Sequence, residues 1–138
     1  MDTITQALLG SAVAYSVAGR KAPRASVLYG AAFGILPDLD VFIQYANDLD
    51  TMTFHRSWTH SWIVHSLLAP LVAWLMSKLD QRVDFRRWLA LIWLVWITHS
   101  GLDAMTVYGT QLFWPFMPPP ASIGSIFIID PLYSLPLA

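Results

Sequence analysis

WLALIWLVWITHSGLD, residues 88–103, decides the fold, because this stretch carries no polar stripe until its last turn. A helix that is apolar on every side belongs in a membrane or in a large core. Hydrophobic residues make up 56% of the 138-residue chain and charged residues 12%, against roughly 45–50% and about 25% in an average soluble domain. One domain of this size cannot bury several such helices completely, so the sequence predicts membrane insertion.

Further apolar runs lie on both sides of this stretch. Four runs each predict a helix: Ile4–Gly19, Ala25–Leu36, Trp62–Ser77 and Trp88–Leu102. A fifth begins near Ile123 and is interrupted by Asp130 and by prolines. We predict an all-α, multi-pass helical membrane protein, with about four apolar helices plus a partial fifth, in one domain over residues 1–138.

The lengths of the four runs leave an alternative open. They are 12 to 16 residues long, whereas a bilayer crossing needs about 20 residues and at least about 17. Either their polar ends lie at membrane depth, or some helices are re-entrant or packed inside the protein. A compact soluble helical domain is the competing interpretation.

The distribution of charge predicts a topology. Seven of the eight basic residues lie in two loops, one after the first run and one after the third: Arg20, Lys21, Arg24, Lys78, Arg82, Arg86 and Arg87. If each run crosses once, both loops lie on the same side, which should be cytoplasmic. The opposite, outer side then receives His55, His60, His99 and most of the aspartates.

Composition limits the chemistry of any site on that face. The chain has no cysteine, so a metal would be held by His, Asp or backbone oxygen. Net charge is −1, which gives no support to nucleic-acid binding. Neither a Gly-rich phosphate loop nor a G-x-S-x-G nucleophile elbow occurs.

Two carboxylates follow the second run in the segment LPDLD, residues 36–40. Asp38 and Asp40 come directly after a proline and can point at one hard or borderline cation. The alternative is a polar helix stop with solvated aspartates.

Two histidines precede the third run in the segment HRSWTHS, residues 55–61. His55 and His60 can converge on Zn²⁺ or a similar ion across the junction between loop and helix. The alternative is an interfacial loop anchored by Trp58 and Trp62, which leaves the histidines unexplained.

The same segment carries groups suited to an anion. Either Thr59 or Ser61 could cap the helix that follows, and a helix N-terminus favours bound anions. Arg56 is the one basic residue on this face and could clamp a phosphate or carboxylate.

The fourth run ends in His99 and Asp103, whose spacing places them on one helical face. They could ligate one metal, or Asp103 could orient His99 through its other ring nitrogen. A structural His–Asp hydrogen bond is the alternative.

Other ionisable residues receive weaker assignments. His65 lies five residues after His60, so on a helix it points away from His60. A packed, hydrogen-bonded role is therefore favoured for His65 over a role as ligand. Asp130 lies in an apolar run and could be a late ligand or a partner of one. Asp48 and Asp50 are expected to be solvated loop charges.

Taken in order, the segments resemble the YdjM-type family of bacterial inner-membrane proteins assigned as metal-dependent hydrolases. The matching elements are Met1–Gln6, Leu36–Asp40, His55–Ser61, His99–Thr110 and Ile128–Tyr133. The resemblance spans nearly the whole chain. Many relatives carry His where this chain has Gln6, so position 6 is expected to supply no ligand here. Members are often longer, so this chain is expected to be a short form or the N-terminal part of a longer one.

The resemblance implies a multi-pass protein of the bacterial inner membrane with a metal-dependent hydrolase activity. The implied site positions are Asp38, Asp40, His55, His60, His99 and Asp103. The cofactor would be a divalent metal ion, with zinc the first choice, that activates water. Asp38 or Asp40 would be ligand or general base, and Arg56 would stabilise developing negative charge.

A site at the membrane surface suggests a lipid, phosphoester or other amphiphilic substrate, with membrane lipid as its partner. The competing function is a non-catalytic membrane protein, whose His/Asp cluster is a structural, sensing or cation-transport site. The two differ in one physical feature, because an enzyme keeps an open coordination position and a structural site is closed.

Overall fold

The computed structural model describes residues 2–42, 57–107, 109–116, 120–125 and 136. The described residues form four α-helices and two 3₁₀ helices: α1 (Thr3–Ala18), α2 (Pro23–Ile35), η1 (Leu36–Phe42), η2 (Trp58–His60), α4 (Trp62–Leu79) and α5 (Phe85–Ala104). They contain no strand beyond one isolated antiparallel bridge, between Thr110 and Ala121. The predicted all-α class is confirmed. The start of the expected fifth helix, residues 123–125, is not helical, and its remainder lies outside the described residues.

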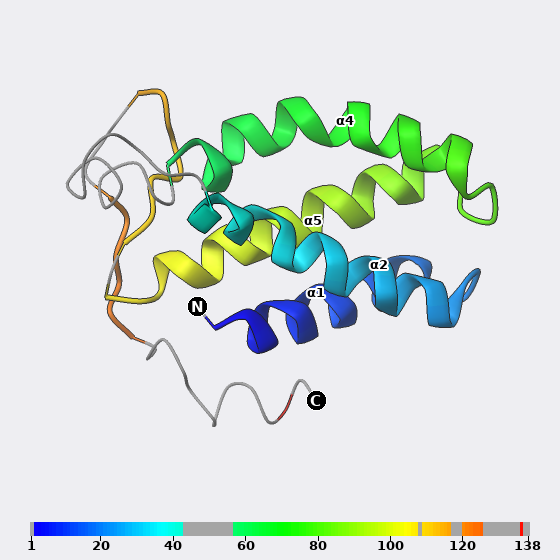
Figure 1. Ribbon diagram of the computed structural model, residues 1–138, viewed down its shortest axis with the longest axis horizontal. Coiled ribbons are helices and arrows are strands. Elements are labelled where there is room, and N and C mark those ends of the chain that lie inside the picture. Colours follow the sequence, from blue (N-terminus) through cyan, green and yellow to red (C-terminus); the bar gives the residue numbers. More distant parts are fainter. Residues whose placement is uncertain (1, 43–56, 108, 117–119, 126–135, 137–138) are drawn as a thin grey trace.

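The four α-helices form two antiparallel hairpins, α1 with α2 and α4 with α5 (Figure 1). Helix α5 packs against all three others. Its buried side chains recur every three or four residues along one stripe, from Trp88 through Leu91, Ile92, Val95 and Trp96. The same stripe continues into His99 and Asp103, so the face that packs the core also carries the polar residues.

Glycines bring α1 and α2 into backbone contact. A Cβ atom on Gly10 would lie 2.2 Å from the carbonyl oxygen of Gly30, and one on Gly34 would lie 2.5 Å from that of Gln6. Gln6 and Gly34 are therefore held close to each other, and each also contacts a polar side chain of α5.

Caps fix where three helices begin. Asp2 accepts the backbone N–H of Thr5 at the start of α1, and Asp84 accepts that of Arg87 at the start of α5. Of the two caps considered for α4, the structure uses Ser61, whose hydroxyl accepts the N–H groups of Ile63 and Val64. Thr59 is thereby free for another role.

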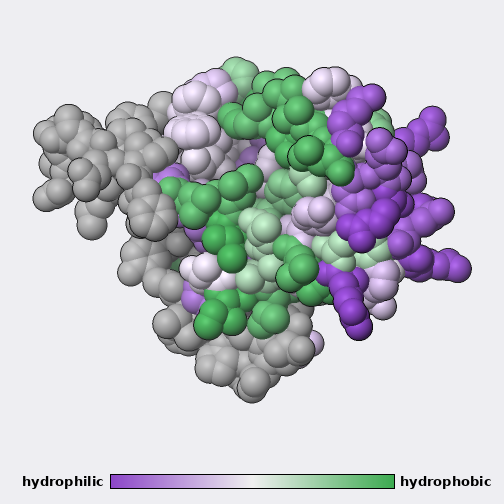
Figure 2. Space-filling view, turned by 45° about the vertical axis from the view of Figure 1, so that its right-hand side comes forward, coloured by the Kyte–Doolittle hydropathy of each residue, from purple (hydrophilic) through white to green (hydrophobic). Residues whose placement is uncertain are grey.

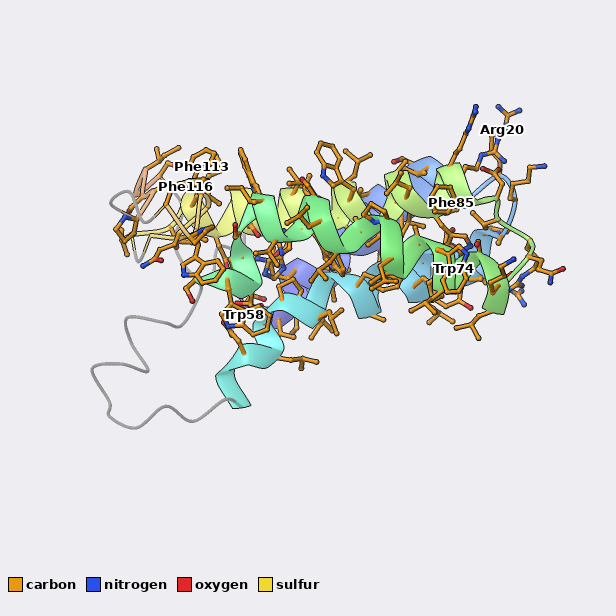
Figure 3. All side chains as sticks on the ribbon, turned by 90° about the horizontal axis from the view of Figure 1, so that it is seen from above. Arg20, Trp58, Trp74, Phe85, Phe113 and Phe116 are labelled. Carbon is orange, nitrogen blue, oxygen red and sulfur yellow. The ribbon has the colours of Figure 1, made fainter. Side chains whose placement is uncertain are left out.

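The two ends of the helix bundle differ in chemistry. The turns after α1 and α4 lie at one end, where Tyr29 donates a hydrogen bond to Asp80 and joins the two hairpins. Figure 2 shows hydrophilic residues gathered at this end, and Figure 3 places Arg20 there, opposite Trp58, Phe113 and Phe116. All seven basic residues of the two loops belong to this end, which we call the basic end.

Among the described residues, only α4 is both long and apolar enough to cross a bilayer. Helix α1 is apolar but shorter, with 16 residues. The described part of the chain therefore has one candidate span. Large apolar side chains are nevertheless exposed on every α-helix, among them Ile4, Leu28, Leu67 and Trp93.

Candidate metal centre

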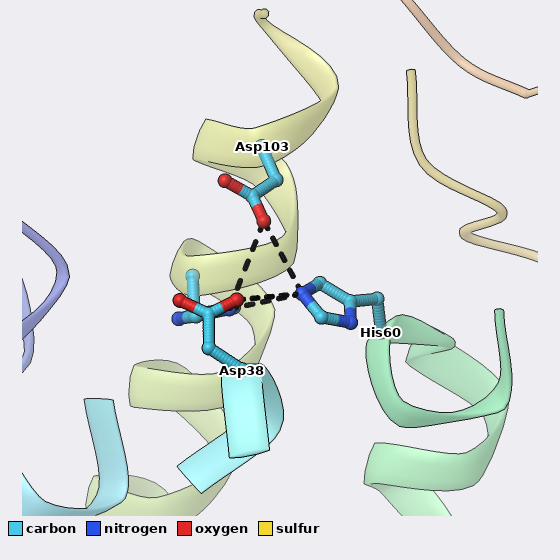
Figure 4. Close-up of side chains that lie close together, drawn as sticks. Asp38, His60 and Asp103 are labelled. Carbon is cyan, nitrogen blue, oxygen red and sulfur yellow. Dashed lines mark hydrogen bonds and ion pairs between the residues drawn. The ribbon is translucent and has the colours of Figure 1, made fainter. Parts of the chain in front are cut away.

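Four side chains converge at the end of the bundle opposite the basic end (Figure 4). Asp38 comes from η1, His60 from η2, and His99 and Asp103 from α5. Their ligand atoms all lie within 4.8 Å of one another. The His60 Nε2 atom is 3.1 Å from His99 Nε2, 3.3 Å from Asp38 Oδ1 and 3.2 Å from Asp103 Oδ2. Such a group could hold a metal ion.

The cluster is buried except along one edge. The side chains of His60 and Asp103 are 0% exposed and that of His99 is 1% exposed, whereas that of Asp38 is 18% exposed. Asp38 is thus the member that reaches the surface. Any ligand or water would approach beside its carboxylate.

The orientation of His99 is fixed by a backbone oxygen. Its Nδ1 atom lies 2.7 Å from the carbonyl oxygen of Gly34 on α2. A carbonyl can only accept, so Nδ1 must carry the proton. The Nε2 atom of neutral His99 therefore presents a lone pair to the cluster. Asp103 does not orient His99 through the far nitrogen, because Gly34 occupies that position.

The orientation of His60 is fixed by a relay of two side chains. The hydroxyl of Thr59 donates to Asp40 Oδ2 at 2.7 Å and lies 3.0 Å from His60 Nδ1. Since a carboxylate accepts, the Thr59 proton points to Asp40, and the Thr59 oxygen is left to accept the Nδ1–H of His60. Neutral His60 therefore also presents a bare Nε2 to the cluster.

Asp103 is held from α1. Gln6 is buried, and its Nε2 donates to Asp103 Oδ1 at 3.1 Å and to the carbonyl oxygen of His99 at 3.4 Å. This hydrogen bond turns the other carboxylate oxygen, Oδ2, toward the two imidazoles. Gln6 thus orients the candidate ligand Asp103 and is not itself a ligand.

The donor set suits a cation. Two lone-pair nitrogens and two carboxylate oxygens face one point, and an arrangement of this kind needs positive charge at its centre. Tetrahedral zinc with bonds of about 2.0–2.1 Å has ligand atoms roughly 3.3 Å apart. The measured separations are 3.1 Å between the imidazoles and 3.2 to 3.8 Å between imidazole and carboxylate. The residues present therefore fit a divalent metal with nitrogen and oxygen ligands.

The charges of the cluster shift two pKa values. Burial lowers the pKa of His60, but hydrogen bonds to Asp103 and Asp38 outweigh it and leave the pKa above its usual value. Burial raises the pKa of Asp38, but hydrogen bonds and charge from His60 and His99 outweigh it and leave that pKa well below its usual range. A proton on His60 and a bound metal therefore compete for the same Nε2 atom, since a ligand imidazole must be unprotonated there.

The structure places some of the residues predicted from the sequence in the cluster and others outside it. It brings together Asp38, His60, His99 and Asp103. Asp40 lies beside them, 3.9 Å from His60 Nδ1, on the ring edge that faces away from the cluster. Five of the predicted residues lie outside the described residues: His55, Arg56, Asp48, Asp50 and Asp130.

His65 is packed and hydrogen-bonded, as its rotation on the helix predicted. It is buried, its Nε2 atom lies 2.8 Å from the carbonyl oxygen of Thr59, and its ring contacts Trp96. Sequence reasoning missed the roles of Gln6, Thr59 and the Gly34 carbonyl. Gln6 and Gly34 act on residues of another helix, and the relay through Thr59 depends on its bond to Asp40 in η1, so no local pattern signals these roles.

A comparison with protein families assigns the whole chain to one family. The model of the YdjM inner membrane protein family matches residues 1–138. Searches of curated proteins and of solved structures gave no match. Because the match covers every residue of the chain, including the four that converge, this protein belongs to the YdjM family of inner membrane proteins.

Proposed function

We propose that this protein is a membrane-bound, metal-dependent hydrolase. His60, His99 and Asp103 would be the ligands, and Asp38 would line the open position. The observation that carries the proposal is the pair of bare Nε2 atoms facing two carboxylates, with each imidazole locked in that tautomer from behind. A closed hydrogen-bonded cluster needs no such matched orientation.

The difference in exposure supports the division of roles. Three buried donors, two imidazoles and one carboxylate, resemble in type the His₂Glu sets that hold catalytic zinc with one position left for water. Asp38 is the member of the cluster at its exposed edge. Its carboxylate can accept a hydrogen bond from a water molecule and take a proton from it.

A bound divalent ion would acidify water to a pKa of about 7 and polarise the scissile group. Zinc is our first choice of metal, because it accepts both imidazole and carboxylate ligands. The surrounding residues hold the geometry: Gly34 and Thr59 keep the imidazoles turned inward, and Gln6 holds Asp103. Arg56 stays a predicted partner for negative charge in the substrate.

An apolar cavity beside the cluster supports an amphiphilic substrate. It has a volume of about 180 Å³ and is lined mainly by apolar side chains, with Pro37 and Thr59 in its wall. These two residues directly precede Asp38 and His60. A cavity of about 150 Å³ holds a benzene-sized group, so this one could take a short alkyl segment. A lipid, an acyl ester or a phosphoester with an alkyl chain is therefore the proposed substrate class.

We propose that the site faces the outer side of a multi-pass chain. The basic end would be cytoplasmic by the positive-inside rule, which leaves the His/Asp cluster at the outer face. Exposed apolar side chains on α1, α2 and α5 as well as α4 support insertion of the whole bundle. Helices shorter than a full span could be accommodated by local thinning of the bilayer.

The burial of the cluster also favours one competing function. Three of its four side chains are essentially inaccessible, and a closed four-ligand site would be structural. Such a site would hold η1 and η2 against α5 and would catalyse nothing.

One experiment separates the two functions. Detergent-purified wild type and Asp38→Asn are analysed for metal by plasma mass spectrometry and assayed on p-nitrophenyl esters and phosphates of increasing chain length, with and without chelator. The hydrolase proposal expects near-stoichiometric metal in both proteins and chelator-sensitive turnover in wild type alone. Metal without turnover on any substrate would favour the structural site. Absence of metal after reconstitution would overturn both.

A further inference from the structure

A second hollow lies far from the His/Asp cluster, on the surface between α4 and α5. It has a volume of about 380 Å³ and is lined by Ser66, Pro70, Arg86, Leu89, Ala90 and Trp93. The four α5 residues are spaced so that they share one helical face. From Arg86 to Trp93 the helix rises about 10 Å, so the groove runs from the basic end toward the middle of the bundle.

The groove has one charged side chain and otherwise mostly apolar walls. Arg86 is exposed, and none of the described carboxylates forms a salt bridge with it. The two aspartates of the basic end are already paired, Asp80 with Arg82 and Asp84 with Arg87. Among the described residues of this end, seven basic side chains therefore face two carboxylates that are already paired, so Arg86 can bind an added anion.

The groove is shaped by contacts within the protein. The indole Nε1 of Trp93 donates to the hydroxyl of Ser66 at 3.0 Å, so the Trp93 ring is tied across the two helices. Pro70 lies inside α4, and Ala90 is small. Together these residues leave a recess beside the Trp93 ring, where the side chains of α4 and α5 do not pack against each other.

We infer that this groove binds one anionic phospholipid. The guanidinium of Arg86 would hold the phosphate, which it can contact through two N–H groups, and an acyl chain would lie along Leu89, Ala90 and Trp93. A soluble anion does not match apolar walls, and a zwitterionic lipid does not match an excess of positive charge. Basic pockets between membrane helices on the cytoplasmic side are suited to anionic headgroups, and the family places this chain in the inner membrane.

The inference is independent of hydrolase activity and is tested by native mass spectrometry on the detergent-solubilised full chain. Wild type is titrated with dioleoyl phosphatidylglycerol or dioleoyl phosphatidylcholine. Arg86→Gln is compared with Lys78→Gln, which removes the same charge from the same end at an exposed position outside the groove. Ala90→Trp fills the groove while keeping Arg86, and Arg86→Lys keeps the charge.

We expect one phosphatidylglycerol to bind wild type in preference to phosphatidylcholine. Arg86→Gln should weaken that binding about tenfold or more, as the loss of a charge-assisted hydrogen bond does, and Lys78→Gln by less than about twofold. Ala90→Trp should also lose the lipid, Arg86→Lys should retain part of the binding, and glycerol phosphate should not compete. Equal binding of both lipids, equal losses in Arg86→Gln and Lys78→Gln, or undiminished binding to Ala90→Trp would overturn the inference.

Discussion

His60 and His99 face each other through their Nε2 atoms, 3.1 Å apart, while each Nδ1 atom is hydrogen-bonded on the far side. The partner of His99 is a carbonyl of α2, and that of His60 is a hydroxyl whose own proton is given to Asp40. In its neutral form each ring therefore presents an Nε2 lone pair to the same point. Adjacent carboxylates from Asp38 and Asp103 complete a set that attracts a cation.

Removal of either imidazole should abolish metal binding. We expect His60→Ala and His99→Ala to purify with little metal, because each loses one of three proposed buried ligands. His65→Ala is the matched control, since His65 is buried on α4 and hydrogen-bonded to Thr59 but lies outside the cluster. It should keep its metal and lose about 1–3 kcal/mol of folding free energy. Equal metal in all four proteins would exclude the centre.

Gln6→Ala should weaken metal binding without removing a ligand. The substitution frees Asp103 Oδ1 from its hydrogen bond with the Gln6 amide, and changes of this kind typically cost about 10–100-fold in affinity. Competition with a chromophoric chelator gives the affinity. Ser11→Ala, on the same helix and with its own interhelical hydrogen bond to Val27, should leave it unchanged. A Gln6→Ala affinity equal to that of wild type would show that Asp103 is held by other contacts.

Metal affinity should depend on the hydroxyl group of Thr59 more than on the shape of its side chain. Thr59→Val keeps the branched side chain but breaks the relay from Asp40 to His60, so His60 can turn its ring or change tautomer. We expect a fall in metal affinity of about tenfold or more for Thr59→Val and little change for Thr59→Ser. Similar losses in both variants would indicate a packing role for Thr59, and no loss in either would remove the relay from the site.

Acid should remove the stabilising ion pair between Asp80 and Arg82 at the basic end. The hydrogen bond from Arg82 lowers the pKa of Asp80 to about 2, from 3.8 for the unperturbed group. Because the folded pKa is the lower one, this carboxylate stabilises the fold above about pH 4, and its contribution is lost as pH falls toward 2. Chemical unfolding in detergent at several pH values measures the effect.

Asp80→Asn provides the control for that titration. It should be less stable than wild type at neutral pH, and the difference should shrink below pH 4 as wild-type Asp80 is protonated. A constant difference between the two proteins down to pH 2 would contradict the assignment. The Tyr29 hydrogen bond to Asp80 is present in wild type and can persist with Asn, which isolates the effect of charge.

The sequence by itself determined the helices and one half of the candidate centre. The four apolar runs predicted from the sequence lie within about three residues of the observed helix boundaries, because hydrophobic periodicity is a local property of the chain. The spacing of His99 and Asp103 placed both on one face of α5 for the same reason. Charge in the two loops also separated a basic end from a polar end, since the helices alternate in direction.

Only the tertiary structure decided which side chains share one centre. Asp38 and Asp40 are equivalent in sequence, yet Asp38 lies against both imidazoles and Asp40 bonds to Thr59. That difference depends on how η1 meets η2, which is a contact between residues about 20 positions apart. The tautomer of His99 likewise depends on Gly34, whose carbonyl reaches it because glycines let α1 and α2 pack in backbone contact. The orientation of side chains from different helices toward one another depends on tertiary packing, so a local sequence pattern does not encode it.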